Sequence, residues 1–141
     1  MDMETRTVIA DTGFIVALLN QSDVRHQDVA PIYQQHPSIL FPQTVLAEVA
    51  YLLGRDAGIS TVTAFLKGLP KSRFRVIALT ETDLNRIAEI LTKYADSRID
   101  FVDASVMAVA ERLSITTILT LDQRDFRLFR PQHCQSFELL P

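Results

Sequence analysis

The stretch Thr7-Val8-Ile9-Ala10-Asp11-Thr12-Gly13 decides the fold, because a short apolar run is stopped by an acid and a glycine. Residues 7–10 have the character of a central strand, since a strand covered on both faces is continuously apolar. The Asp-Thr-Gly that follows is turn chemistry, and residues 14–19 are apolar enough to form a short helix behind it. A buried strand, a tight turn and a helix are typical of an α/β fold.

The remainder of the chain repeats this alternation of strand and helix, and it contains no internal repeats or low-complexity tracts. Further strands are predicted at residues 39–41, 74–79 and 115–121, with a last edge strand at residues 136–140. Helices are predicted at residues 23–35, 43–53, 61–69, 83–94 and 100–113, whereas residues 126–129 are expected to form a loop or short turn. The pattern predicts an α/β fold with a central parallel sheet of about five strands, flanked by helices on both sides.

Polar residues mark the starts of several of these helices. Asp23 and Ser60 are suitable N-caps for the helices that follow them, because their side chains can accept a hydrogen bond from a free backbone N–H. Thr80 and Asp83 have the spacing of a capping box. Asp100 is expected to cap the helix that it opens.

The composition is that of an ordinary globular protein, with 48% hydrophobic and 22% charged residues, and 141 residues are expected to form one domain. A net charge of −3 gives no global basic field to indicate nucleic-acid binding. The lone Cys134 excludes an internal disulfide framework and a multi-cysteine zinc site. No apolar stretch approaches the roughly 18 residues of a membrane span, and residues 1–7 lack a signal-peptide core. We therefore expect a cytoplasmic protein without a membrane segment.

Four acids, far apart in the sequence, are predicted to lie where strands end or helices begin: Asp11, Glu48, Asp103 and Asp122. In an open α/β sheet, ligands bind outside the carboxyl ends of the strands, at the point where the strand order reverses. If the strands before Asp11 and Asp122 are neighbours, these two carboxylates face one pocket, and Glu48 and Asp103 can lean over it from their helices. Clustered carboxylates repel one another and take up protons unless a cation lies among them.

The cation that matches such a cluster is Mg²⁺ or Mn²⁺, which prefers hard oxygen ligands and keeps several waters. A metal held by carboxylates lowers the pKa of a bound water and neutralises charge that develops on a phosphate, so that phosphodiester cleavage is the chemistry indicated. Thr12 and Thr120 flank two of the acids and can orient them, or a bound water, through their hydroxyls.

Each acid also has an ordinary structural interpretation. Asp11 can simply cap the helix behind it, and Asp103 can complement a helix dipole. Glu48 can be a surface residue, although its neighbours in the sequence are unusually apolar. Asp122 and Asp125 can be plain loop residues. The joint pattern is harder to explain in this way than any single acid.

Two other classes of protein place acids in related patterns. Asp-Thr-Gly occurs in aspartic proteases, but those enzymes are built mainly of β-structure and pair two such motifs, whereas this chain has one motif and many helices. Receiver domains gather acids at strand ends, but they need a second acid beside the first one and a late lysine. Position 10 is Ala10, and no lysine follows Lys93.

Four short segments, in this order, give the chain a resemblance to a known family: Val8-Ile9-Ala10-Asp11-Thr12-Gly13, Leu46-Ala47-Glu48-Val49, Asp100-Phe101-Val102-Asp103-Ala104-Ser105 and Ile118-Leu119-Thr120-Leu121-Asp122-Gln123-Arg124-Asp125-Phe126. The chain resembles the PIN-domain ribonucleases, and most closely the VapC toxins of bacterial toxin–antitoxin pairs. Each segment is weak alone, but the ordered set covers nearly the whole chain. The resemblance implies that residues 1–141 form a single PIN-like domain with a parallel sheet between helices.

The resemblance also implies a metal site in which Asp11 and Asp103 are the main ligands of Mg²⁺ or Mn²⁺. Glu48 and Asp122 would complete this site or hold its waters, with Asp100 and Asp125 nearby in the sequence. It further implies a homodimer and a VapB-type antitoxin, which often blocks the site with an inserted arginine. An arginine suits an acidic pocket electrostatically.

The activity expected from the residues and the resemblance together is a metal-dependent endoribonuclease that cuts RNA such as tRNA or rRNA. Two basic stretches are candidates for phosphate contacts: Lys67, Lys71, Arg73 and Arg75, and then Arg124, Arg127 and Arg130. The alternative is a catalytically silent PIN-like interaction module. The retention of all four acids argues against that alternative, because an inert domain gains nothing from their mutual repulsion.

Overall fold

A computed structural model of the chain describes residues 7–141, and its centre is a five-stranded sheet in which all strands are parallel. The strand order is β3-β2-β1-β4-β5. The strands are β1 (Thr7–Ala10), β2 (Ser38–Pro42), β3 (Phe74–Ile77), β4 (Thr117–Leu119) and β5 (Glu138–Leu140). The first three strands extend the sheet in one direction from β1, and the last two extend it in the other. The order therefore reverses between β1 and β4, which is where α/β sheets bind their ligands.

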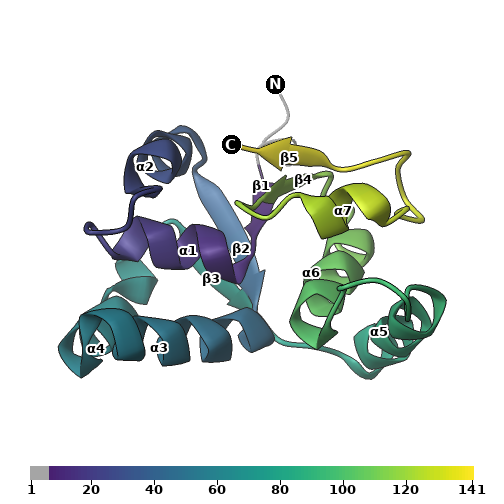
Figure 1. The fold of residues 1–141 in the computed structure, drawn as a ribbon, viewed down its shortest axis with the longest axis horizontal. Helices are drawn as coiled ribbons and strands as arrows, with labels where there is room; N and C mark the ends of the chain where they lie inside the picture. Colours follow the sequence, from purple (N-terminus) through teal and green to yellow (C-terminus); the bar gives the residue numbers. More distant parts are fainter. Residues whose placement is uncertain (1–6) are drawn as a thin grey trace.

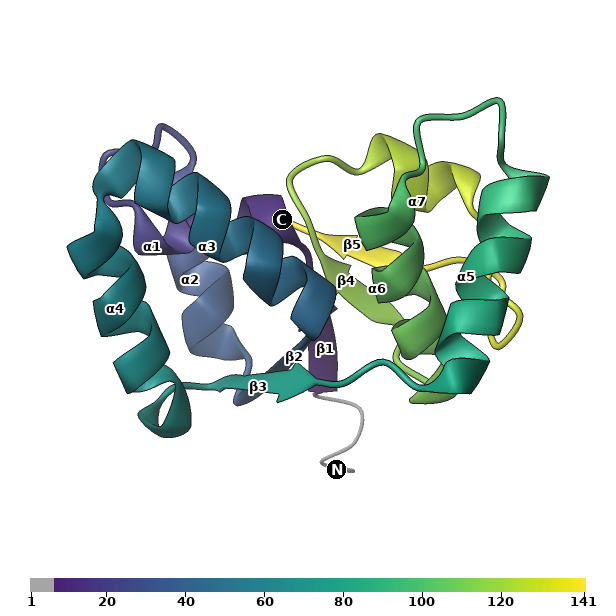
Figure 2. The same ribbon diagram turned by 90° about the horizontal axis from the view of Figure 1, so that it is seen from below.

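Seven α-helices accompany the sheet within the described residues, together with a short 3₁₀ helix at Leu69–Lys71. They are α1 (Thr12–Leu19), α2 (His26–Gln35), α3 (Gln43–Ala57), α4 (Ile59–Gly68), α5 (Glu81–Lys93), α6 (Phe101–Arg112) and α7 (Arg124–Leu128). Figure 1 shows α1 to α4 on the left and α5 to α7 on the right, with the strands between the two groups. The same separation is visible from below in Figure 2.

The first strand is buried as its sequence predicts. Val8, Ile9 and Ala10 are 0–2% exposed, and β1 pairs with β2 on one side and β4 on the other. The backbone N–H of Asp11 donates to the carbonyl of Leu119 at 3.0 Å, so the pairing with β4 continues to the first acid. The predicted fold class is confirmed, and so is the conditional prediction that the strands before Asp11 and Asp122 are neighbours.

Both predicted helix caps of the second half are present. Thr80 caps α5 and exchanges reciprocal hydrogen bonds with Asp83, which completes a capping box. Asp100 caps α6 and forms the same arrangement with Asp103. Both devices involve residues only three apart, so the local sequence is sufficient to specify them.

Two predicted caps are wrong. α2 begins at His26 with Arg25 at the cap position, because Asp23 instead closes a turn by accepting from the Arg25 N–H at 2.8 Å. α4 begins at Ile59 rather than behind Ser60, and its cap is Gly58, whose φ of 91° is readily adopted only by glycine.

Several boundaries also differ from the prediction. α3 runs on to Ala57 instead of ending near residue 53, and α1 starts at Thr12 instead of residue 14. Residues 126–129, expected as a loop or short turn, belong largely to α7 at Arg124–Leu128. The strands β3 and β4 are shorter than predicted, and β5 starts two residues later while keeping its place at the sheet edge.

In the part of the chain from residue 7 onward, no helix is long and apolar enough to cross a membrane. The prediction that residues 1–7 lack a signal-peptide core concerns a segment that, except for Thr7, lies outside the described residues.

Candidate active site

The side chain of Asp11 is buried at the point where the strand order reverses. It is 9% exposed, and it caps α1 by accepting a hydrogen bond from the Phe14 N–H at Oδ1 over 3.1 Å. The hydroxyl of Thr120 donates to its other oxygen, Oδ2. Burial raises the pKa of Asp11 to about 6 against the lowering effect of these two hydrogen bonds, and the nearby charges of Asp122 and Glu48 raise it further. Asp11 therefore caps its helix and also belongs to a group of mutually repelling acids.

The loop after β4 carries Thr120 and Asp122 to the same edge of the sheet. Thr120 is fully buried, its backbone N–H donates to the Leu140 carbonyl at 2.7 Å, and its Oγ1 lies 3.0 Å from the Asp122 carbonyl oxygen. These contacts fix the hydroxyl that holds Asp11. Thr12, the other predicted supporting hydroxyl, is 6% exposed, and its Oγ1 has no hydrogen-bond partner among the described residues.

The first turn of α6 supplies the next two acids. The Asp103 Oδ2 accepts from the Asp100 N–H at 3.1 Å, and the Asp100 Oδ1 accepts from the Asp103 N–H at 2.9 Å. Burial raises the pKa of Asp103 to about 7 despite the lowering effect of the Asp100 backbone N–H, and the charges of Asp100 and Asp125 add to the increase. Asp100 is therefore the predicted helix cap, and Asp103 is a partly buried acid that its neighbours disfavour as an anion.

Glu48 lies in the second turn of α3, and a pair of hydroxyls joins this helix to α6. The Thr44 Oγ1 and the Ser105 Oγ are 2.6 Å apart, and Ser105 is fully buried. Thr44 is four residues before Glu48 and so lies on the same helical face, while Ser105 is two residues after Asp103. This contact fixes the two acid-bearing helices relative to each other, and no local pattern in the sequence predicts it, because its residues are 61 positions apart.

Asp125, which the sequence suggested could be a plain loop residue, is a buried acid in a helix. It is 8% exposed in the first turn of α7, and burial and then the charge of Asp122 raise its pKa. Arg124 and Arg98 lower this pKa, and Asp100 raises it. Asp125 also raises the pKa of Asp103. It thus connects the acids of the β1 and β4 ends electrostatically with those of α6.

These side chains suit a divalent cation by their chemistry. Their donors are carboxylate oxygens with hydroxyls beside them, which Mg²⁺ and Mn²⁺ prefer. The raised pKa values of Asp11 and Asp103 indicate that burial and mutual repulsion oppose their ionisation, which a cation would relieve. Within residues 7–141, no three acidic, histidine or cysteine side chains are already close enough together to hold one ion. The residues fit the metal by type and charge, and not by a preformed cage.

The two basic stretches predicted from the sequence occupy different places. Arg73 and Arg75 lie at β3, at the sheet edge away from β4, and their guanidinium groups bond to backbone carbonyls of nearby residues. Arg124 and Arg127 instead line a groove that Thr120 and Asp122 share. Arg73 and Arg75 are therefore structural and lie away from β4, whereas Arg124 and Arg127 adjoin Thr120 and Asp122, and Arg130 lies outside that groove.

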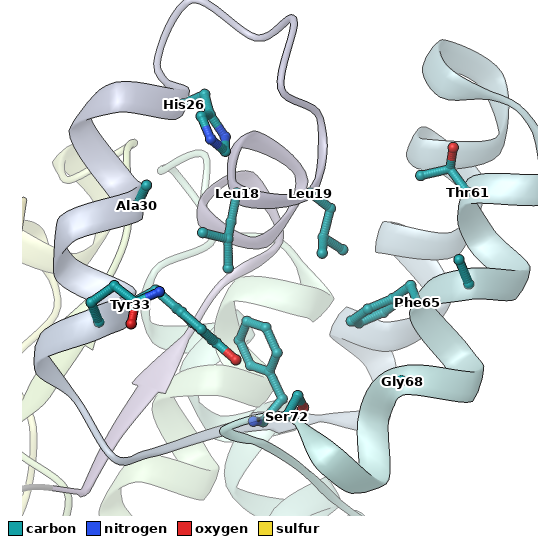
Figure 3. Close-up of a pocket in the computed structure, with 12 residues that line it drawn as sticks. Leu18, Leu19, His26, Ala30, Tyr33, Thr61, Phe65, Gly68 and Ser72 are labelled. Atoms are coloured by element: carbon teal, nitrogen blue, oxygen red, sulfur yellow. Dashed lines mark hydrogen bonds between the residues drawn. The ribbon is translucent and has the colours of Figure 1, made fainter.

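A second groove, of about 540 Å³, lies between α1, α2 and α4, away from the acids. Its lining includes apolar side chains on all three helices, and Figure 3 shows several of them pointing into the space between, among them Leu18, Leu19 and Phe65. Phe126 and Phe129 are core residues, 0–2% exposed, and line neither of these two grooves.

Comparison with known protein families shows the class of this protein. Residues 8–130 match the PIN domain, and the chain belongs to that family. It is 30% identical over 135 residues to Ribonuclease VapC26 of Mycobacterium tuberculosis, covering 95% of this chain and 100% of the relative. The predicted resemblance to VapC-type PIN domains is thereby confirmed.

Solved structures agree. Mycobacterium tuberculosis VapC20, described as a Sarcin-Ricin loop cleaving toxin, superposes with a TM-score of 0.76 at 26% identity, over 82% of this chain and 90% of that one. A toxin–antitoxin complex from Klebsiella pneumoniae matches with a TM-score of 0.63 at 15% identity, over 84% of this chain and 89% of the other, and shares the fold.

Proposed function

We propose that the chain is the toxin of a VapBC-type pair, an endoribonuclease that cleaves RNA such as tRNA or rRNA with Mg²⁺ or Mn²⁺. The proposal rests mainly on the four acids Asp11, Glu48, Asp103 and Asp122, called the acid group below, which lie near the ends of β1 and β4. Its members Asp11 and Asp103 have pKa values raised to about 6 and about 7 by burial and neighbouring charge. The relative named as a ribonuclease supports the choice of RNA as substrate.

In this proposal Asp11 and Asp103 hold the metal directly, and Glu48 and Asp122 complete the site or bind its waters. When bound, the metal would supply a water of lowered pKa and positive charge against the developing negative charge on the phosphate. The Thr120 hydroxyl and the Phe14 N–H hold the Asp11 carboxylate in one orientation. Such fixed orientation is what precise positioning of the reacting groups requires.

The α6 side of the site is oriented in the same manner. The Asp100 N–H holds one oxygen of Asp103, so the carboxylate cannot rotate freely. The hydroxyl pair of Thr44 and Ser105 keeps Glu48 at a fixed place relative to α6. Asp103, with a pKa of about 7, holds a proton near neutral pH until a cation displaces it. Metal binding is therefore expected to release protons.

The groove between α1, α2 and α4 is our proposed surface for a VapB-type antitoxin. A toxin–antitoxin complex shares this fold. The groove's apolar lining, with Leu18, Leu19 and Phe65, suits an amphipathic segment that buries its apolar face. The antitoxin would also reach the acids with an arginine. We further propose a homodimer, and action in the cytoplasm where the RNA substrates are.

The experiment is to incubate the purified chain with total RNA in Mg²⁺ or Mn²⁺, and then in EDTA. We expect discrete cleavage that needs the metal. Asp11→Asn is expected to abolish it, because the variant removes a ligand charge while keeping the size of the side chain. Asp56→Asn is a matched control, since Asp56 is an exposed aspartate paired with Arg55 and distant from the acid group.

The alternative, a catalytically silent interaction module, makes a different prediction for the same experiment. It requires that no metal-dependent cleavage occurs with any RNA in the pool. Equal cleavage by the wild type and Asp11→Asn, or cleavage indifferent to EDTA, would exclude the proposed mechanism. Loss of activity in Asp56→Asn as well would show that the assay reports folding and not the site.

A further inference from the structure

A groove of about 620 Å³ adjoins the acid group and is lined by three arginines. Arg124 and Arg127 come from α7, and Arg25 comes from the residue just before α2. The loop after β4 contributes Thr120 and Asp122 to the same groove. Since α2 and α7 belong to the left and right helix groups of Figure 1, the groove extends across both halves of the molecule.

The charge around the acid group makes this placement informative. A chain of net charge −3 with acids at its reactive edge repels a polyanion such as RNA. Guanidinium groups beside the acids offset part of this repulsion: Arg124 lowers the pKa of Asp125, although burial and the charge of Asp122 still raise that pKa overall. Arginine pairs with phosphate through two parallel hydrogen bonds, which gives orientation as well as attraction.

Two of these arginines are already held in place. The Nε of Arg25 donates to the Asp28 Oδ2 at 2.5 Å, and the side chain remains 46% exposed. The Nη2 of Arg127 donates to the Gln123 Oε1 at 2.6 Å. A guanidinium has five N–H donors, so each of these bonds leaves most donors available to a ligand. Holding the side chain in advance reduces the entropy that binding would otherwise cost.

We propose that Arg25, Arg124 and Arg127 bind the phosphodiester backbone of the RNA strand beside the phosphate that is cleaved. This inference rests on the proposed function and adds the residues that position the substrate. The groove would hold the flanking backbone, and the acids would hold the metal that binds the reacting phosphate. Arg25 was not among the basic residues that the sequence singled out, because its partners in the groove follow it by about 100 positions.

The test is the salt dependence of binding to a labelled single-stranded RNA oligomer, measured with Asp11→Asn as the parent so that the RNA stays intact. For single strands, log K falls with log[salt] by about 0.7 for each phosphate contact. Arg25→Gln is therefore expected to weaken binding and to make this slope shallower by about 0.7. The double variant with Arg124→Gln and Arg127→Gln is expected to make the slope shallower by about twice that amount.

The chain offers a close control for Arg25. Arg55 is also exposed and also bonds through Nε to a neighbouring aspartate, Asp56, but it lies at the end of α3 and outside the groove. Arg55→Gln is expected to leave the slope unchanged. Asp28→Asn removes a negative charge beside Arg25 while the asparagine oxygen can still accept from the Arg25 Nε, so it is expected to tighten RNA binding more than Asp56→Asn does. All of these side chains are at least 38% exposed, so the substitutions spare the core.

The outcomes separate this inference from the proposed function. Slopes for Arg25→Gln and the double variant equal to those of the parent and Arg55→Gln would overturn the backbone site, whether or not the wild type cleaves RNA. If the wild type fails to cleave RNA but the Arg25-dependent slope is present, the ribonuclease proposal falls and the backbone site stands. A shallower slope in both groove variants, with wild-type cleavage, supports the two together.

Discussion

Asp11→Asn is expected to make the chain more stable while it abolishes cleavage, and the structure gives the size of the effect. The Asp11 carboxyl is buried, and its pKa in the folded chain is about 6, against an ordinary value of 3.8. Asparagine has nearly the same shape. Its Oδ1 can still accept from the Phe14 N–H, and its Nδ2 can donate to the Thr120 hydroxyl, which then donates to the Asp122 carbonyl 3.0 Å away.

The sign follows from the proton bound by each state. Between pH 3.8 and about 6 the folded chain retains the Asp11 proton and the unfolded chain does not, so wild-type stability falls as pH rises through this window. A difference of about 2 pH units, at about 1.4 kcal/mol each, makes the ionised carboxylate cost about 3 kcal/mol above pH 6. Asparagine removes this cost. The expected gain corresponds to roughly 10 °C in Tm at most.

The measurement is urea and thermal unfolding of the wild type and Asp11→Asn in EDTA, at pH 7.5 and pH 4. We expect the variant to be more stable by about 3 kcal/mol at pH 7.5, and by less than about 1 kcal/mol at pH 4, which is close to the ordinary pKa of 3.8, so that ionisation of Asp11 has only begun to favour the unfolded state. Asp56→Asn serves as the exposed control and is expected to show no such gain.

In the presence of a divalent metal, we expect the wild type to become the more stable of the two proteins. A ligand that binds only the folded state stabilises it in proportion to the logarithm of its concentration over Kd. Mg²⁺ or Mn²⁺ should therefore raise the Tm of the wild type and have little effect on Asp11→Asn. A variant less stable than the wild type at pH 7.5 in EDTA, or a gain that is the same at pH 4, would refute the assignment of Asp11 as a buried, disfavoured carboxylate.

Three other substitutions each test one local feature of the structure. Thr120→Val removes the hydroxyl that lowers the pKa of Asp11, so that pKa should rise further above about 6, measured by carbon NMR titration in EDTA with Thr120→Ser as the control. Gly58→Ala should destabilise the chain by about 1 kcal/mol or more because its φ is 91°, whereas Gly68→Ala, with open space around it at the end of α4, should be neutral or slightly stabilising in urea unfolding. Ser105→Ala breaks the hydroxyl contact between α6 and α3 and should cost about 1 kcal/mol, with reduced kcat if that contact also positions the acids.

The parts of the fold that the sequence predicted correctly depend on local signals. The strand 7–10 is recognisable because three apolar residues, Val8, Ile9 and Ala10, run into Asp11. The helix caps at Thr80 and Asp100 are recognisable because each bonds to a residue only three positions further on. No long-range contact is needed to specify any of these features.

The errors arose where partners distant in the sequence decide the outcome. β4 is only three residues long because β1 ends at Ala10, and the β1–β4 register pairs Ile9 with Ile118 and Ala10 with Leu119. Ile115, which was predicted to open this strand, donates its N–H to the Ala110 carbonyl of α6 and not to a neighbouring strand, so its β-propensity was overridden. Asp23 had a suitable cap sequence, but its side chain closes a turn with Arg25 instead.

The same division applies to the candidate site. Asp11, Asp103 and Asp122 could be picked out one by one because each stands beside a local element boundary, and Glu48 because its neighbours in the sequence are unusually apolar. The hydroxyl of Thr120 on Asp11 joins residues 109 positions apart, and the contact between Thr44 and Ser105 joins residues 61 positions apart. Contacts over such separations exist only once the sheet order is set, so a single sequence could suggest the groups but not their pairing.

α7 contributes to both of the sites that we propose near the ends of β1 and β4, although the sequence indicated a loop or short turn there. Its first turn turns Asp125 inward, where the side chain is 8% exposed and its charge adds to that of Asp103. The same short helix presents the exposed Arg124 and Arg127 to the groove. A loop would not hold one acid inside and two arginines outside at fixed spacing. The helix therefore places Asp125, whose repulsion with the other acids favours a cation, directly beside the arginines that would attract a phosphate backbone.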